Sequence, residues 1–566
     1  MKNMRLIYCI ALLLFLLPAL MLGQDLRLIP YSGQASSYIN AQIAADTVAN
    51  GKLPNRTYVL TRGALYLANA VFTNTGNWTL RIKANDSTTT KKPVVMLYPS
   101  GTGSTPWNPP GNFIQMGGSL VLKNIELTGY YELVDTNRWN MQGALINIPA
   151  TASSLSITID SCILSNVNGN HIRTDGVPST IRITNTVFAN LGYLGRSNLG
   201  AGKAVDLRNV SCDSLIMVNN TFVNWLDRIV RHYPATGATS TGALGYFQFD
   251  HNTLVNGTSY HGLLSLGSMG AKSIITNNLF YDPFILGNDT DATRQVEYIP
   301  SGELDKFGGA RMTWIFSYPN TTTAWTVANN YYCISDSGQA FYNQFSAAGV
   351  TGEGSPLTWH INGKLGADST KAFTKLKVAL NKIPATMTQL ARWYRAPNGG
   401  NKLKNTPGAW VYGNASDPND FDRKKYDWLR DSLSCVYPTT SALFTGAVKG
   451  FPVGYLNWFP TSKSQWLVTD VEPVSNVIPS TFQLQQNFPN PFNPSTTIQY
   501  SIAQKSHVVL EVFNVLGQSV ARLYDGELSA GTYHATFDAS RLSSGVYLYR
   551  LQAGDFVQTQ KMVLMK

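Results

Sequence analysis

A short pattern of alternating apolar residues, a polar bend and a further apolar step recurs through the N-terminal two thirds of the chain. In the copy at 213–225, Ile216 and Val218 alternate with polar or flexible neighbours, Asn220 follows, and an apolar pair comes next. A strand that buries one face has this alternation. Comparable copies start at Leu120, Ile157, Ile181 and Ile274, and copies shifted by one residue contain Asn252 and Asn330.

The spacing of these copies, about 24 to 37 residues, indicates a solenoid, because one strand–bend–strand unit cannot bury its apolar face alone. We therefore predict an all-β chain whose main domain is a right-handed parallel β-helix. Asparagine suits the bend because its amide tolerates left-handed backbone angles and can bond to the equivalent residue on neighbouring coils. The alternative is an ordinary β-sandwich with Asn-rich loops, which the regular spacing disfavours.

The first residues predict export. Residues 1–23 combine Lys2 and Arg5 with the apolar run Ile10–Leu17 and then Pro18. This is the pattern of a secretory signal peptide. The run is too short to span a bilayer and no later stretch is long and apolar enough, so we expect no transmembrane segment.

Four cysteines remain after this segment: Cys162, Cys212, Cys333 and Cys435. Their spacing contains no CxxC, which favours small buried core residues over a disulfide framework or a metal site. A chain with 44% hydrophobic residues can fill its core without cross-links.

The repeats place the β-helix at 24–345, and the residues that follow have a different composition. Residues 346–470 carry fifteen Lys and Arg against eight Asp and Glu, whereas 24–345 carry twenty-one against nineteen. We expect 346–470 to be a basic, partly helical segment that packs on the β-helix, with a helix at 367–382. Most of the net charge of +11 thus lies outside the β-helix. No recognisable nucleic-acid-binding module accompanies it, so we expect no nucleic-acid partner.

A second set of strands between these repeats carries many of the ionisable side chains. If Ile146, Ile172 and Val205 point inward, alternation places their polar neighbours on one outer face. That predicted column contains Asn147, His171, Arg173, Asp175, Asp206, Arg208, Arg228 and Ser265, with Lys203, Arg231 and His232 close to it. Such a column would line a groove for a repeating polymer; the alternative is a solvated face with ion pairs between coils.

An acidic insertion at 281–322 interrupts the spacing. Long insertions in solenoids leave from one face and often shape the binding side. Carboxylate oxygens there would suit calcium, although no D-x-D-x-D-G loop is present.

The last part of the chain has short alternating strands separated by Gly, Pro and Asn turns, which predicts a small β-sandwich after a linker at 471–483. The strings Asn490-Pro-Phe-Asn-Pro-Ser-Thr-Thr497 and Leu542-Ser-Ser-Gly-Val-Tyr547 stand in it. Residues 484–566 resemble the C-terminal sorting domain of type IX secretion. The resemblance implies a Gram-negative exporter, the type IX machinery as partner, and release outside the cell or attachment to surface lipopolysaccharide. The alternative is a carbohydrate-binding or adhesion sandwich.

The stretch Gly450–Pro460 resembles the closing segment of secreted β-helix proteins of the pectate-lyase-like superfamily, although Tyr455 stands where an Asp is common. In that superfamily a Lys or Arg on an outer face abstracts a proton, and calcium or a basic group neutralises the substrate carboxylate. The resemblance covers the fold rather than the activity, and many enzymes of that superfamily make a polysaccharide lyase acting on a uronate-containing polymer by β-elimination our first hypothesis. The candidate base is Arg208 or Arg231; candidate substrate-binding residues are His171, Arg173, Lys203, Arg228 and His232; weak candidate calcium ligands are Asp175 and Asp206.

Two other functions fit the same sequence. A glycoside hydrolase needs two facing carboxylates, for which Asp175 and Asp206 are the candidate pair. A non-catalytic surface adhesin, matrix protein or polysaccharide-binding scaffold needs only the solenoid and its outer face. Since a fold alone does not determine function, the catalytic and the non-catalytic predictions both stand at this point.

Overall fold

The computed structural model describes residues 25–565 apart from 54–55, 75, 77, 88, 98–111, 130–142, 168, 193–199, 233–241, 347–349, 351, 396–427, 470–471, 476–480, 489, 494, 529 and 540–541. The expected signal peptide at 1–23 lies outside the described residues. The chain divides into two units, Met1–Trp458 and Phe459–Lys566.

Three long parallel sheets make up the first unit, and within the described residues they hold ten, ten and nine strands. Sheet A contains β1 (Leu26–Arg27), β2 (Tyr58–Leu60), β5 (Leu80–Ala84), β8 (Leu120–Lys123), β11 (Ser153–Asp160), β14 (Val177–Thr184), β17 (Cys212–Val218), β20 (Leu244–Asp250), β23 (Met269–Thr276) and β26 (Ala324–Ala328). Sheet B contains β3 (Leu65–Ala68), β6 (Val94–Leu97), β9 (Glu126–Thr128), β12 (Ile163–Val167), β15 (Val187–Leu191), β18 (Thr221–Trp225), β21 (Thr253–Gly257), β24 (Leu279–Tyr281), β27 (Asn330–Cys333) and β29 (Phe373–Lys375). Sheet C contains β4 (Phe72–Asn74), β7 (Asn112–Met116), β10 (Ala144–Ile148), β13 (Asn170–Thr174), β16 (Lys203–Arg208), β19 (Arg228–His232), β22 (Leu264–Ser265), β25 (Thr313–Phe316) and β28 (Ser355–Leu357).

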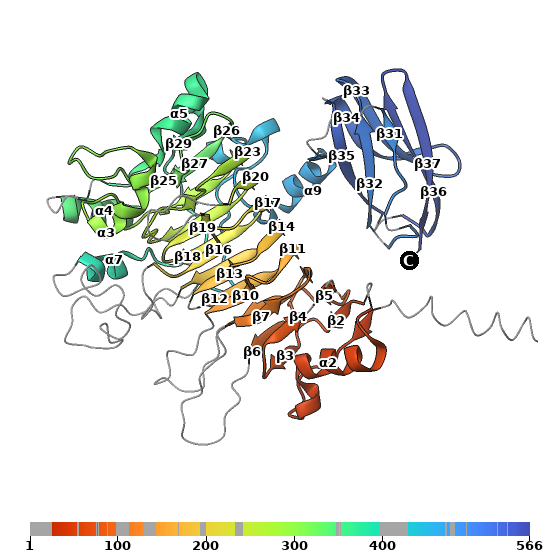
Figure 1. Ribbon diagram of the computed structural model, residues 1–566. Helices are drawn as coiled ribbons and strands as arrows, with labels where there is room; N and C mark the ends of the chain where they lie inside the picture. The colour runs from red at the N-terminus through yellow and green to blue at the C-terminus, as the bar shows by residue number, and fades with distance from the viewer. Residues whose placement is uncertain are drawn as a thin grey trace, which may run out of the picture. The chain divides into compact units, whose positions relative to one another are not determined.

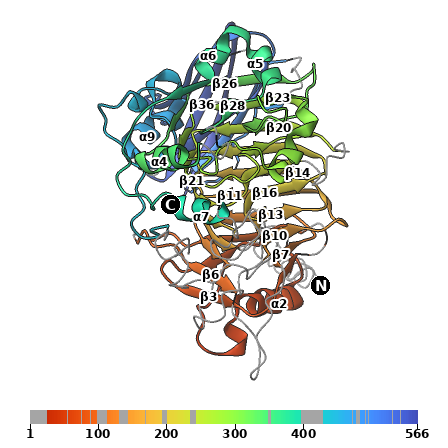
Figure 2. The ribbon, with the colours of Figure 1, turned by 90° about the vertical axis from the view of Figure 1, so that its left-hand side faces the viewer.

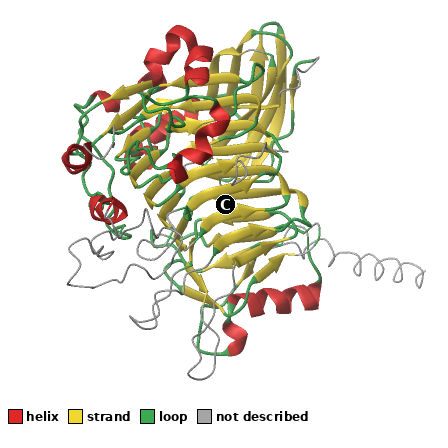
Figure 3. Cartoon of the chain, turned by 60° about the vertical axis from the view of Figure 1, so that its left-hand side comes forward, coloured by secondary structure: helices red, strands yellow, loops and turns green. Residues whose placement is uncertain are grey.

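Successive strands enter sheets A, B and C in turn, so each coil of the chain adds one strand to every sheet. Figures 1 and 2 show these strands stacked coil upon coil, and in Figure 3 they lie side by side in yellow. Strands of neighbouring coils pair in parallel, as β11 does with β14 and β14 with β17. The predicted right-handed parallel β-helix is confirmed.

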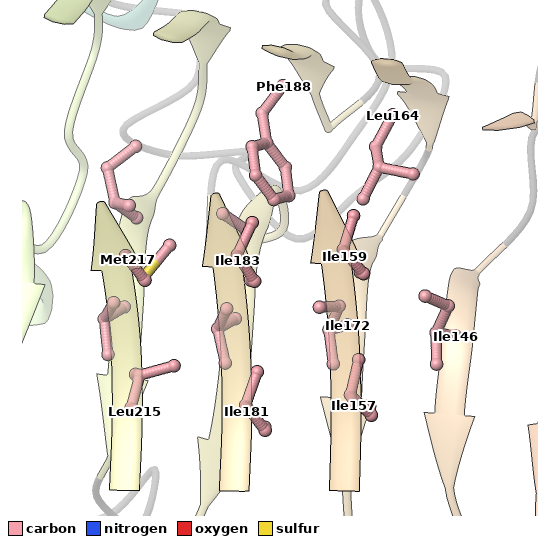
Figure 4. Close-up of a cluster of buried hydrophobic side chains, with 14 of the residues drawn as sticks. Ile146, Ile157, Ile159, Leu164, Ile172, Ile181, Ile183, Phe188, Leu215 and Met217 are labelled. Carbon is pink, nitrogen blue, oxygen red and sulfur yellow. The ribbon is translucent and has the colours of Figure 1, made fainter. Parts of the chain in front are cut away.

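The interior consists of rows of apolar side chains, one residue from each coil. Figure 4 shows such rows, and in one of them Ile159, Ile183 and Met217 lie at equivalent positions and are fully buried. The predicted inward position of Ile216 is wrong by one residue, since Leu215 and Met217 fill the core instead. The run at 215–218 is apolar on both faces, so alternation alone could not show which face is buried.

A ladder of asparagines holds the coils at the bend between sheets A and B. The first bend residue, such as Asn219, has a positive φ of 56°, which Asn tolerates at low cost. The next residue is a buried Asn: the N–H and Nδ2 of Asn220 both donate to Asn252 Oδ1, at 2.9 and 3.0 Å. Asn252 donates in the same way to Asn278, and Asn278 to Asn330. The predicted stacking of bend asparagines is confirmed. The two copies whose sequence pattern is shifted by one residue contribute Asn252 and Asn330 to the same ladder.

A second ladder runs through sheet B. Asn256 Nδ2 donates to Asn224 Oδ1 at 2.7 Å, Asn224 to Asn190 at 3.1 Å, and Asn190 to Asn166 at 2.8 Å. All four residues have positive φ. Each of these strands therefore contains a local irregularity that sequence alternation does not reveal.

Later segments of the chain run along the outside of both ladders. Met387 N donates to Asn256 Oδ1 at 2.7 Å, and Leu456 N donates to Asn219 Oδ1 at 2.6 Å. Arg430 Nε lies 2.9 Å from each oxygen of the buried Glu126 carboxylate. These contacts hold parts of the segment after 375 against the β-helix.

Helices and short turns cover the ends and sides of the first unit. They are α2 (Ile39–Asn50), α3 (Ala292–Gln295), α4 (Asp336–Phe345), α5 (Trp359–Leu365), α6 (Ser369–Ala372), α7 (Thr388–Arg395), and the 3-10 turns η1 (Ala35–Ser37), η2 (Val296–Ser301), η4 (Gly366–Asp368), η6 (Ala442–Phe444), η7 (Val448–Gly450) and η8 (Leu456–Trp458). α2 contributes Ile39 and Ile43 to the same core as the strands, as a capping segment should.

The C-terminal end of the β-helix differs from the sequence prediction. Strands β28 and β29 extend sheets C and B past the predicted boundary at 345. The predicted helix at 367–382 is wrong, because only Ser369–Ala372 is helical and Phe373–Lys375 pairs with β27. The Phe373 ring packs 5.5 Å from Phe280, and this burial outweighs the local helical pattern.

The second unit consists of α9 (Pro460–Thr469) and two antiparallel sheets. One contains β30 (Glu472–Ser475), β35 (Gly531–Asp538), β32 (Ser495–Ile502) and β31 (Gln483–Leu484), and the other contains β34 (Ser519–Leu528), β33 (Ser506–Phe513), β36 (Gly545–Ala553) and β37 (Phe556–Leu564). A separate buried cluster that includes Ile498, Val512 and Tyr549 lies between them. The predicted small C-terminal sandwich is confirmed, and β30 forms within the segment predicted to be a linker.

The asparagine ladder predicts a large effect of a single truncation. Asn252→Ala removes the acceptor of the buried Asn220 N–H, and each unsatisfied buried group costs about 1–3 kcal/mol. We expect the free energy of unfolding of the first unit to fall by about 2–4 kcal/mol, measured by urea denaturation followed by tryptophan fluorescence. Asn343→Ala, at an exposed position of α4, is the control and should change it by less than about 0.5 kcal/mol. Equal effects of the two substitutions would contradict the role of the ladder.

Candidate functional site

The outer face of sheet C carries a row of polar side chains, one on each coil. The register places Asn147 beside Arg173, Arg173 beside Asp206, Asp206 beside Arg231, and Arg231 beside Ser265. These five residues occupy one row because each lies at the same position of a parallel strand. The sequence prediction of a polar column holds for Asn147, Arg173, Asp206 and Ser265, and Arg231, which was expected only close to the column, lies in the same row.

Half-exposed charges form the first part of this face. Arg173 Nε lies 3.3 Å from Asp175 Oδ2, and Arg208 Nε lies 3.6 Å from Asp175 Oδ1, with all three side chains 37–39% exposed. Two guanidinium groups share one carboxylate, which leaves a net charge of +1. Ion pairs this open contribute about 0–1 kcal/mol each, so stability alone is a weak reason for them.

Further along the row, the charges are covered. The side chains of Asp206 and Arg231 are 2% and 8% exposed, and Arg231 Nη1 lies 3.7 Å from Asp206 Oδ2. Asn170 Nδ2 donates to the same oxygen at 3.0 Å, and the N–H of Arg208 donates to the other. Arg231, a predicted base, is therefore held by a carboxylate and has little contact with solvent.

Five ionisable side chains meet at the bend between sheets B and C: Lys203, Asp227, Arg228, His261 and Glu297, the buried charge cluster. Lys203 Nζ lies 2.8 Å and Arg228 Nε 2.9 Å from Asp227 Oδ2, and His261 Nδ1 lies 2.7 Å from Asp227 Oδ1. Glu297 comes from η2 in the insertion and pairs with Arg228, while its Oε1 lies 3.7 Å from His261 Nε2. The cluster thus joins three consecutive coils to the insertion.

Burial and pairing set the protonation of this cluster. Burial raises the pKa of Asp227, but Arg228 and Lys203 outweigh it and hold that pKa well below its usual value. Burial also raises the pKa of Glu297, and Arg228 outweighs it, so the net pKa is lowered. Burial lowers the pKa of Lys203 and of His261 against the pull of the nearby carboxylates. His261 is therefore neutral at pH 7, with Nδ1–H donating to Asp227.

Four of the five predicted substrate-binding residues are buried, and this part of the prediction is wrong: Lys203 and Arg228 pair with Asp227, and His171 and His232 do not face outward. His171 is fully buried against Phe188, with Nε2 3.1 Å from Leu164 O, and burial lowers its pKa to about 3. His232 is also fully buried, and its two ring nitrogens contact backbone carbonyl oxygens. At 171 and 172 two successive residues turn inward after the bend, so simple alternation fails there.

The predicted calcium ligands do not fit a calcium site. Calcium takes six to eight oxygen ligands. Asp175 is instead paired with Arg173 and Arg208, and Asp206 with Arg231 and Asn170. No group of three or more His, Cys, Asp or Glu side chains suited to a metal occurs among the described residues.

Sequence reasoning missed three members of the buried charge cluster, namely Asp227, His261 and Glu297. Asp227 stands immediately before strand β19, at the bend, although the sequence pattern had placed it within that strand. The acidic insertion was the sequence signal that could have pointed to Glu297. A buried arginine on a strand, such as Arg228, needs a carboxylate partner, and the insertion contains several carboxylates. Which insertion carboxylate supplies it follows only from the fold.

The sandwich of the second unit belongs to a known domain family. Residues 486–565 match the Secretion system C-terminal sorting domain. The chain therefore carries a sorting tail of type IX secretion and is an exported protein of the cell surface or the surrounding medium. No curated protein and no solved structure matches the chain. Among the described residues, no helix is long and apolar enough to cross a membrane.

The buried charge cluster predicts a specific loss on removing one carboxylate. Glu297→Gln leaves the buried Arg228 with fewer partners, so the free energy of unfolding at pH 7 should fall by about 3 kcal/mol. Asp368→Asn, in an exposed pair with Lys371, is the control and should have little effect.

The same variant tests the pH dependence. Because the folded pKa of Glu297 is lowered, its contribution is present above its unfolded pKa of about 4.3 and is lost as pH falls through the folded value. Glu297→Gln should therefore lose less further stability than the wild type on acidification below about pH 5, measured by urea denaturation at each pH. Parallel pH curves for the two proteins would contradict this.

Proposed function

We propose that this exported protein binds an acidic, uronate-containing polysaccharide along the outer face of sheet C. The observation that carries the proposal is the half-exposed pair of Arg173 and Arg208 on adjacent coils with one carboxylate, Asp175, between them. Guanidinium groups bind carboxylates with two parallel hydrogen bonds, and an excess cation on an open face remains available for an anion.

The arrangement suits a polymer. Neighbouring strands of sheet C lie about 4.8 Å apart, so cations and amides recur along the face at a regular interval. Gln115 and Asn147 continue the row on the coils before Arg173, and Asn147 Nδ2 donates to Gln115 Oε1 at 3.1 Å. A place in the pectate-lyase-like superfamily is part of the same proposal, supported by the parallel β-helix and its polar outer face.

A second candidate function is cleavage of that polymer by β-elimination, and His261 favours it. A neutral imidazole oriented by Asp227 at 2.7 Å is a suitable general base. It would take the proton next to the uronate carboxylate, the electron pair would form the ring double bond, and the glycosidic oxygen would leave with its electrons and gain a proton. Arg208 is half-exposed and paired with Asp175, which suits a role in binding, whereas Arg231 is covered and paired with Asp206.

A glycoside hydrolase has less support. It requires one carboxylic acid and one carboxylate that face each other across the sugar. Asp175 and Asp206 are each held by arginine, and Asp206 is almost fully buried.

Binding is tested with the full-length protein and immobilised polygalacturonate, alginate and glycosaminoglycans. Arg173→Ala and Arg208→Ala should each weaken binding about tenfold, since a charge-assisted hydrogen bond is worth about 1.5–3 kcal/mol. Arg182→Ala, on sheet A, is the matched control and should bind as the wild type does. Affinity should fall as salt rises, because exposed charges are screened. Unchanged binding by both variants would refute this face as the site.

Elimination is tested by the ultraviolet absorbance of unsaturated uronate products from the same polymers. His261→Asn keeps a donor for Asp227 but removes the base, so turnover should fall by about 10²-fold or more in a protein that circular dichroism shows to be folded. His507→Ala, an exposed histidine of the sorting domain, should keep full activity. No product from the wild type, in a sample that binds polymer, would restrict the function to binding.

A further inference from the structure

A pocket of 270 Å³ lies on the insertion between β24 and β25, away from the polar row. Its lining includes Asn288, Leu304, Lys306, Phe307, Arg311 and Trp359. A hairpin-like loop that closes with a bridge between Leu304 and Ala310 forms one wall, and the start of α5 forms another. A volume this small suits one sugar-sized group.

Aromatic rings make the pocket wall unusual for a protein surface. Phe307 and Trp359 are 57% and 56% exposed, and Leu304 is 58% exposed. Exposed apolar side chains scattered singly need no explanation, but three around one hollow indicate a ligand. The faces of the rings can pack against the C–H groups of a pyranose ring, which is apolar on its faces and polar at its edge.

The charges around the pocket favour an anionic group. The two acidic lining residues are already occupied: Asp289 pairs with Arg294 and Arg395, and Asp305 accepts hydrogen bonds from Gln295 and from backbone N–H groups. Lys306 Nζ lies 5.0 Å from the centre of the Phe307 ring, and no carboxylate among the described residues pairs with it. An exposed cation beside an aromatic ring complements a sugar that carries a carboxylate.

We infer that this pocket is a second binding subsite that holds one uronate residue of an acidic polysaccharide. The sugar ring stacks on Trp359 and Phe307, and its carboxylate meets Lys306. The inference rests on the proposed function only for the choice of an acidic polymer.

The pocket lies next to β28, the edge strand of sheet C, whose outer face carries the polar row. Arg311, one of its lining residues, donates through Nη2 to Ser355 of β28 at 2.5 Å and stacks 4.9 Å from the Trp359 ring. Five strand-to-strand steps separate β13, which holds Arg173, from β28, or roughly 24 Å at about 4.8 Å each. A polymer can reach both places at once, whereas a disaccharide cannot.

Titration calorimetry of the full-length protein with galacturonate, mannuronate and glucuronate disaccharides, and with the neutral galactose disaccharide, tests the pocket. One of the acidic disaccharides should bind, and Trp359→Ala and Phe307→Ala should weaken it at least tenfold. Ile299→Ala, an exposed apolar position on the same insertion outside the pocket lining, is the matched control and should have no effect. Lys306→Met should remove the preference for the acidic over the neutral sugar.

The outcomes separate this inference from the proposed function. Trp359→Ala should abolish disaccharide binding at the pocket, and Arg173→Ala should weaken binding of the long polymer. If disaccharide binding requires Trp359 but polymer binding is unchanged in Arg173→Ala, the result would support the pocket and refute the sheet C face. No binding of any disaccharide, or equal binding by Trp359→Ala, Phe307→Ala and the wild type, would overturn the inference.

Discussion

Hydrogen bonds between bend asparagines set the register on which the rest of the first unit depends. Asn220, Asn252, Asn278 and Asn330 form a continuous buried chain in which each side-chain oxygen satisfies a backbone N–H of the neighbouring coil. A parallel strand that slips by one residue exchanges its inner and outer side chains. The ladder opposes that slip at every coil, because a displaced amide would leave buried donors without acceptors.

The same register places two buried cations next to each other, and nearby carboxylates neutralise them. Lys203 and Arg228 occupy paired positions of adjacent strands, so two cations stand next to each other out of solvent. Like charges in directly paired positions destabilise a sheet. Asp227 lies within 2.9 Å of both, and Glu297 reaches Arg228 from the insertion. The insertion is therefore required to neutralise the coil it covers, which fixes its position over sheet C.

Sequence periodicity was sufficient for the architecture but not for every orientation. The spacing of repeats predicted the β-helix because stacking is what such units need. The predicted orientation was wrong at Ile216, because the neighbouring Leu215 is equally apolar. It was also wrong at His171, because two successive residues after the bend point inward. Neither error could be corrected from one strand alone, since both depend on pairing with the next coil. His261 and Glu297 come together only through the path of a long insertion, which no local pattern encodes.

Charge pairing separates the parts that stabilise the fold from those that can hold a ligand. In the buried charge cluster Lys203, Asp227, Arg228 and Glu297 are paired with one another, so these four charges stabilise the fold, and the neutral His261 is the member with a proposed chemical role. At Arg173 and Arg208, and again at Lys306 beside Phe307, positive charge exceeds its described partners and is exposed. The sorting tail specifies export and not the activity of its cargo, so function must be argued from these sites. Two weak sites on one β-helix unit give a long polymer a high effective concentration at the second site once the first is bound. That gain applies only to a repeating ligand, which is why the geometry favours a polysaccharide over a single sugar.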